Sequence, residues 1–208
     1  RKTTGGNYNS FVYRYDALLD TFIITSTYPG TPAYTTCSFT ANSKAYIGIG
    51  FPLTNEIWEF NPSTNTWASK ASFPGTQRQN ASAFGINGLG FIGGGAYDPV
   101  IAYDDLWSYN PITNMWDSLT TIPGGGRFAA LEFTLNNKIY IGCGNNYIAY
   151  LKDLWSYDTF SNIWTQEDDF GGVARYSTSA FSIGNTAYAG SGKAIGFLND
   201  YWEFSQST

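Results

Sequence analysis

The sequence predicts an all-β protein made of a repeated unit of four short antiparallel strands. Of its 208 residues, 18% are aromatic, 13% are charged and 23 are glycines. Aromatic side chains favour strands and glycines favour tight turns, so this composition is typical of short strands rather than of helices. Two further observations support the same fold class: a twelve-residue segment that recurs along the chain, and a pair of strand-like segments before each copy.

The recurring segment reads DLWSYNPITNMW at 105–116 and DLWSYDTFSNIW at 153–164. It returns as EIWEFNPSTNTW at 56–67 and, in part, as DYWEF at 200–204. Its first tryptophan and the aromatic residue two positions later share one face of a strand. Polar turn residues follow, and in the full copies a second tryptophan lies in the next strand. The segment therefore predicts the third strand, a turn and the fourth strand of each unit.

Two more strands are predicted before each copy. The first ends in a recurring phenylalanine and is followed by a polar turn, and the second reads AYIGIG, GFIGGG, IYIGCG or AYAGSG. Both segments are short, aromatic and bounded by Asn and Gly, which is typical of strands. The start of the chain keeps the same spacing with Tyr13, Phe22 and Pro29, so five units are visible.

A repeated four-stranded unit of about 45 to 50 residues is typical of a β-propeller blade. Residues 1–208 are thus predicted to form one propeller region, in which RKTTGG at 1–6 ends a second strand. The prediction gives three strands in the first unit, twelve in the three complete blades and three in the last unit. This total does not make up a whole number of four-stranded blades. We therefore expect part of a ring of six or seven blades. The predicted units are a partial blade at 1–30, blades at 31–75, 76–124 and 125–172, and a partial blade at 173–208.

The strings SYNPITNMW, EFNPSTNTW and FIGGG resemble the kelch-repeat family, whose pattern joins an aromatic strand ending in Gly-Gly to a Y-D/N-P-x-T-N-x-W segment. The resemblance covers essentially the whole chain and implies a kelch-type propeller. NDYWEF and DDFGGVAR also look like secreted kelch proteins of Bacteroidetes-type bacteria, which implies export and attachment to further domains or chain segments. The central domain of galactose oxidase belongs to the same family, but its copper needs histidine ligands and this chain has no histidine.

Composition also excludes several classes of function. The absence of histidine removes Ser-His-Asp and Cys-His catalysis and ordinary zinc sites, so we expect no catalytic set, no metal and no cofactor. A net charge of −5 argues against nucleic-acid binding. No apolar run is long enough to span a membrane. The two cysteines belong to different blades and strand positions, so a disulfide between them is not expected.

Binding is expected on the face that carries the loops between strands two and three, because these loops are longer and more variable than the turns at the other face. Aromatic side chains there are candidates for stacking on a sugar or packing on a protein, with polar neighbours supplying hydrogen bonds. The alternative is that they only cover blade edges. The candidates are Tyr97, Asp98, Tyr103, Asp104, Asn146, Tyr147 and Tyr150.

Arg78, Arg127 and Arg175 occupy the same place in three successive units, just before the inner strand, where the second unit has Ala33. As a ring around the channel mouth they would bind an anion. Because they follow the repeat, the structural alternative is that each bonds backbone carbonyls between neighbouring blades. An acidic residue also recurs two positions before each first tryptophan, which favours a structural role at the start of the strand. These acids are Glu56, Asp105, Asp153 and Asp200.

These features lead us to expect a non-catalytic recognition module, extracellular or on the cell surface, that binds a protein or a glycan through the long-loop face. The family resemblance implies an alternative, a carbohydrate-active enzyme of the sialic acid mutarotase type. There the arginines would clamp an anion and Asp98 or Asp104 would transfer protons. A third hypothesis is an intracellular substrate adaptor joined to other interaction domains.

Overall fold

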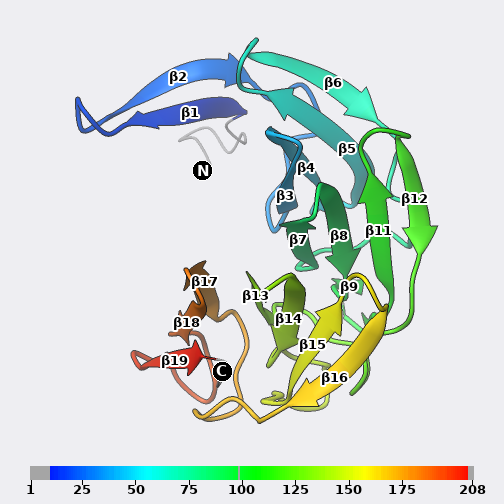
Figure 1. Cartoon of the computed structure of the whole chain (residues 1–208), viewed down its shortest axis with the longest axis vertical. Coiled ribbons are helices and arrows are strands. Elements are labelled where there is room, and N and C mark those ends of the chain that lie inside the picture. The colour runs from blue at the N-terminus through cyan, green and yellow to red at the C-terminus, as the bar shows by residue number, and fades with distance from the viewer. Residues whose placement is uncertain (1–9, 98, 206–208) are drawn as a thin grey trace.

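The computed structural model describes residues 10–97 and 99–205. In these residues all regular structure is β, as the sequence predicts, and the strands form antiparallel sheets that follow one another along an arc (Figure 1). Three sheets have four strands, one has three and two have two. Each larger sheet places its first strand towards a common axis and its last at the periphery, which is the arrangement of propeller blades (Figure 1).

The strands of the first three units are β1 (Phe11–Asp16), β2 (Thr21–Thr27), β3 (Cys37–Ala41), β4 (Lys44–Gly50), β5 (Thr54–Asn61), β6 (Thr66–Lys70), β7 (Ser82–Ile86), β8 (Leu89–Gly93), β9 (Ala96–Tyr97), β10 (Ile101–Ala102), β11 (Leu106–Asn110) and β12 (Met115–Ser118). The last two units contain β13 (Leu131–Leu135), β14 (Lys138–Gly142), β15 (Leu154–Asp158), β16 (Ile163–Glu167), β17 (Ser179–Ile183), β18 (Thr186–Gly190) and β19 (Tyr201–Ser205).

The four-stranded antiparallel blades that the repeat predicts are confirmed in three sheets: β3-β4-β5-β6, β7-β8-β11-β12 and β13-β14-β15-β16. The first unit shows only the pair β1-β2, since the strand end predicted at 1–6 lies outside the described residues. One hairpin, β9-β10, was not predicted. It forms inside a loop that the sequence presents as irregular. The total number of blades in the ring stays a prediction.

Aromatic stacks fill the interfaces between blades. Phe39 on β3 stacks on Tyr46 of β4 with ring centroids 5.0 Å apart, and Tyr109 of the next blade meets Tyr46 edge-on at 5.5 Å. Phe133 and Tyr140 repeat the stack at 4.7 Å. Such pairs add favourable ring contacts to the burial of apolar area, so the repeated aromatic positions hold successive blades together.

Backbone hydrogen bonds link the blades around the axis, at the residues that precede the inner strands. The N–H of Asn80 donates to the carbonyl oxygen of Thr35 at 3.3 Å, that of Ala129 to Asn80 at 3.0 Å, and that of Ser177 to Ala129 at 2.8 Å. All four residues have positive φ, between 49° and 54°. This chain of bonds fixes the backbone at one mouth of the central channel.

Among residues 10–97 and 99–205, no helix has the length and apolar character that crossing a membrane requires.

Close approach of two backbones makes one glycine essential to blade packing. A Cβ at Gly85 on β7 would overlap the carbonyl oxygen of Thr40 on β3, the inner strand of the preceding blade. We expect Gly85→Ala to lower the free energy of unfolding by about 1–3 kcal/mol, because the blades must separate to admit the methyl group. Urea unfolding measures this change.

Gly196→Ala is the matched control, since a Cβ there meets no atom within 4 Å. Equal stabilities of the two variants would contradict the close approach.

Candidate ligand site at the channel mouth

Each of three blades carries a buried arginine bonded to an aspartate of the same blade. The side chain of Arg127 is fully buried, and its Nη1 and Nη2 donate to Oδ1 and Oδ2 of Asp153 at 2.8 and 2.7 Å. Trp155 Nε1 donates to Oδ2 of the same carboxylate at 2.8 Å. Charge-assisted bonds in this two-pronged geometry are strong and directional. The arrangement recurs in Arg78, Asp105 and Trp107 and in Arg175, Asp200 and Trp202.

The structure thus places Arg78, Arg127 and Arg175 inside their blades, with exposed fractions of 1% or less. Each of them also donates to a backbone carbonyl of its own unit, as Arg127 Nη1 does to the oxygen of Cys143 at 3.3 Å. Arg127 Nη2 donates in addition to the oxygen of Pro123, at the end of the preceding unit, at 3.2 Å. A bond to a carbonyl of the neighbouring unit, which the structural alternative assumes for every arginine, is thus present at Arg127, and the other carbonyls that the three arginines bond lie within their own units. Anion binding by the three residues stays a prediction, and the contacts described here favour a role within the blade.

The second unit shows what happens where the arginine is replaced by Ala33. Glu56, which stands in place of the aspartate, accepts instead from the N–H and Oγ1 of Thr31 at 3.0 and 2.9 Å. Its bond from Trp58 Nε1 is kept, at 3.1 Å. The acid before each tryptophan therefore holds the indole and the preceding connection in place, with or without an arginine.

The ion pairs shift the ionisation of the aspartates. Burial by itself raises the pKa of Asp153, but the hydrogen bonds and charge of Arg127 outweigh it and hold the pKa below its ordinary value. Hydrogen bonds from Arg175, and then from Trp202, lower the pKa of Asp200 well below its usual range. Both carboxylates stay ionised at neutral pH, as the pairing requires.

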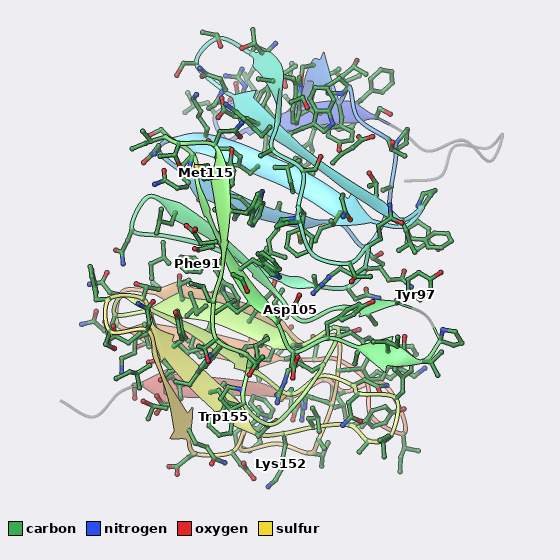
Figure 2. All side chains as sticks on the ribbon, turned by 90° about the vertical axis from the view of Figure 1, so that its right-hand side faces the viewer. Phe91, Tyr97, Asp105, Met115, Lys152 and Trp155 are labelled. Atoms are coloured by element: carbon green, nitrogen blue, oxygen red, sulfur yellow. The ribbon has the colours of Figure 1, made fainter. Side chains whose placement is uncertain are left out.

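The long loops and the connections into the inner strands lie on one face, which we call the loop face. Isolated bridges join the two sets of segments: Tyr34 pairs with Phe51, and Phe128 with Asn145. The turns between third and fourth strands lie on the other face. In Figure 2, Tyr97 of the loop face lies towards the right of the molecule and Met115, near such a turn, lies towards the left.

Candidates from the third blade differ in how accessible they are. Tyr97 on β9 is 45% exposed, and Asp104 is exposed as well. The ring of Tyr103 lies over the guanidinium group of Arg78, with 4.2 Å from Cζ to the ring centroid. Asp98 lies outside the described residues. Tyr97 and Asp104 are therefore open to a ligand, whereas Tyr103 packs on the blade.

The candidates of the fourth blade shape the loop and expose its aromatic side chains. Asn146 Oδ1 accepts from the backbone N–H groups two and three residues later, at 3.0 and 2.8 Å, so this side chain forms the turn itself. Tyr147 packs against Phe128 with 4.7 Å between centroids, and Tyr150 against Tyr176 with 5.1 Å. Both loop tyrosines keep more than a third of their surface exposed.

These pairs belong to a set of aromatic residues around the channel mouth. Tyr34 and Phe51 form a third pair at 5.3 Å. Tyr34, Phe128 and Tyr176 each stand one residue before a positive-φ residue of the inter-blade chain of bonds. We call this set the aromatic rim. It consists of the three pairs Tyr34 and Phe51, Phe128 and Tyr147, and Tyr150 and Tyr176, together with Tyr97, whose neighbour Ala96 bridges to Gln79 just before Asn80 of the inter-blade chain.

Inside the aromatic rim lies a hollow of about 300 Å³. Four units contribute to its wall, and hydroxyl groups, one amide and one carboxyl group supply its polar surface. We call it the channel hollow. It is lined by Thr35, Thr36, Asn80, Ala81, Ser82, Ala129, Ala130, Glu132, Ser177 and Thr178.

Glu132 is the ionisable residue of the channel hollow. It lies on β13, the inner strand of the fourth unit, and borders a second hollow of similar size deeper in the channel. Its carboxyl group accepts from the side chain of Ser82 and the N–H of Ala83 on the neighbouring β7. Burial raises the pKa of Glu132 to about 7, and these two hydrogen bonds oppose the rise only in part. The group can therefore bind or release a proton near neutral pH.

Glu132 is not among the site residues predicted from the sequence, although the sequence carries a signal for it. The equivalent residues before the recurring phenylalanines are Ser38, Ala83 and Ala180. A carboxyl group at one position where the repeat has small residues departs from the pattern. Departures of this kind identify residues that the architecture does not require, and they are better candidates for binding than the repeated arginines.

No protein-family model matches the chain, and no curated protein matches it in sequence. The solved structure of a protein named YjhT is similar in fold, with a TM-score of 0.75 and 20% sequence identity. The match covers 85% of this chain and 64% of that one, so the chain spans less than two thirds of the length of YjhT. At this identity the similarity supports the β-propeller fold and nothing finer.

The buried ion pair should dominate the stability of a blade. We expect Arg127→Met to lower the free energy of unfolding by about 3–5 kcal/mol, because Asp153 is left partly buried without its cation. Thermal or urea unfolding measures the loss. In the second blade, Glu56→Gln changes an acid that has neutral partners only, and its expected cost is less than about 1 kcal/mol. Similar costs for the two variants would contradict the assigned role.

Glu132 should make stability fall as pH rises. In the folded protein Glu132 keeps its proton up to a pKa of about 7, whereas in the unfolded chain it releases the proton near 4.5. As the pH rises between these values, loss of the proton stabilises the unfolded state, and the free energy of unfolding falls. Glu132→Gln removes this dependence, and we expect the variant to exceed the wild type by about 1–3 kcal/mol at pH 8 but not at pH 5. Urea unfolding at both pH values measures the difference. An unchanged difference between the two proteins across this range would contradict the raised pKa.

Proposed function

We propose that the protein is a non-catalytic recognition module that binds a glycan at the channel mouth of its loop face. The observation that carries the proposal is the aromatic rim around the channel hollow. Exposed tyrosine rings present apolar faces that stack on the C–H face of a sugar ring. Hydroxyl, amide and carboxyl groups inside the rim supply the few convergent polar contacts of a ligand site.

We further propose that the blades are of the kelch type and that the protein works outside the cell or on its surface. The kelch motifs of the sequence support the first statement. An acidic composition with few lysines and the likeness to secreted kelch proteins support the second. A protein partner on the same face is the alternative ligand within this proposal.

A second candidate is a carbohydrate-active enzyme of the mutarotase type, which one observation favours. Glu132 combines a pKa of about 7 with a place in a polar hollow, and a general acid or base needs both. The buried, paired arginines give less support to the anion clamp of a sialic acid enzyme. NMR of anomeric exchange tests this candidate, and no acceleration over buffer for sialic acid or common hexoses would exclude it for those sugars.

A glycan array tests the recognition proposal, followed by titration of the best binder against rim variants. Tyr97→Ala and Tyr150→Ala each remove one exposed ring from the aromatic rim, and we expect each to weaken binding about three- to tenfold. Phe160→Ala is the matched control, because Phe160 is 73% exposed in the turn between β15 and β16 on the other face. Absence of any glycan signal, or equal weakening by the control, would contradict the proposal.

A further inference from the structure

The channel hollow contains one ionisable group and no cation to balance it. Among the residues that line the channel hollow and the deeper hollow, Glu132 is the only one that titrates in the neutral range. The other lining residues carry hydroxyl, amide, small apolar and phenyl side chains, and they lie on the inner strands or just before them. The nearby buried thiol of Cys37 on β3 has its pKa raised mainly by burial, and next by the charge of Glu132. The arginines of the blades are already paired with aspartates.

The carboxyl group of Glu132 retains capacity to bind a ligand. An ionised carboxylate has about four acceptor sites. Ser82 and the N–H of Ala83 use two of them, both from β7. Those two bonds hold the group in place while the rest of its capacity stays available to a donor in either hollow.

Within the described residues, a buried hydroxyl in the wall of the channel hollow lacks a hydrogen-bond partner. Thr178 Oγ1 is buried and, within the described residues, makes no hydrogen bond. Thr178 precedes β17 and lines the wall of the channel hollow together with Glu132. A buried hydroxyl without a partner costs free energy, which a ligand that bonds to it would recover.

We propose that the channel hollow selects its sugar by charge: it binds amino sugars, whose ammonium group pairs with Glu132, more tightly than neutral sugars, and rejects acidic sugars. This inference rests on the glycan-binding proposal and names its ligand class. A carboxylate ligand would face Glu132 with no cation in the walls of the channel hollow, whereas an ammonium ligand gains a charge-assisted hydrogen bond. The chain's net charge of −5 acts in the same direction.

Three matched methyl glycosides test the inference: methyl glucosaminide, methyl glucoside and methyl glucuronide, titrated into the whole chain and followed by ligand-observed NMR. We expect the glucosaminide to bind about tenfold more tightly than the glucoside at pH 7.5, and the glucuronide most weakly. Glu132→Gln keeps the shape of the side chain but removes its charge. It should abolish the preference for the glucosaminide and improve binding of the glucuronide.

Asp117→Asn is the control for net charge, because Asp117 is an exposed acid on the outer strand β12. It should leave the order of the three sugars unchanged. Equal binding of the three sugars, or an order that survives in Glu132→Gln, would overturn the inference while the glycan-binding proposal stands. Failure of every sugar to bind, on the array and in titration, would overturn both.

Discussion

The buried pair of Arg127 and Asp153, repeated in the neighbouring blades, connects the interior of each blade to its loop face. The arginine lies just before an inner strand and the aspartate just before a third strand, so the pair joins the two segments that meet at this face. A charge in a protein interior is tolerated only when it is paired and hydrogen-bonded, which fixes both partners. Trp155 Nε1 donates to the same carboxylate, so the ion pair also holds the indole side chain of the third strand, β15, in place. The aromatic rim is therefore held by rigid supports.

Most of the fold could be predicted because each blade must solve the same packing problem with the same residues. The tryptophan segment gave the register, and the Phe39–Tyr46 and Phe133–Tyr140 stacks show why aromatic residues recur where they do. The hairpin β9-β10 was not foreseen, because Ala96–Tyr97 and Ile101–Ala102 are too short to show a strand pattern. Local turn chemistry, more than periodicity, determines such a pair.

The candidate site was harder to predict, because the repeat directs attention to residues that serve the architecture. For Arg127 the sequence leaves anion binding and a structural role as alternatives, and no sequence spacing shows that Asp153 meets it. Glu132 looked like any residue of an inner strand. The raised pKa of Glu132 depends on the packing of four units around the channel, because this packing buries the carboxyl group. Departure from the repeat was the signal available in the sequence.

The inter-blade chain of backbone bonds has a direction. From Ser177 through Ala129 and Asn80 to Thr35, each N–H points to the carbonyl of the preceding unit. The two ends of this chain of bonds consequently present opposite polarity, a carbonyl at Ser177 and an amide at Thr35. A blade that continues the arc at either end must arrive head to tail, as in a heterologous contact that closes into a ring. Two copies related by a twofold axis perpendicular to the channel would instead bring like ends together.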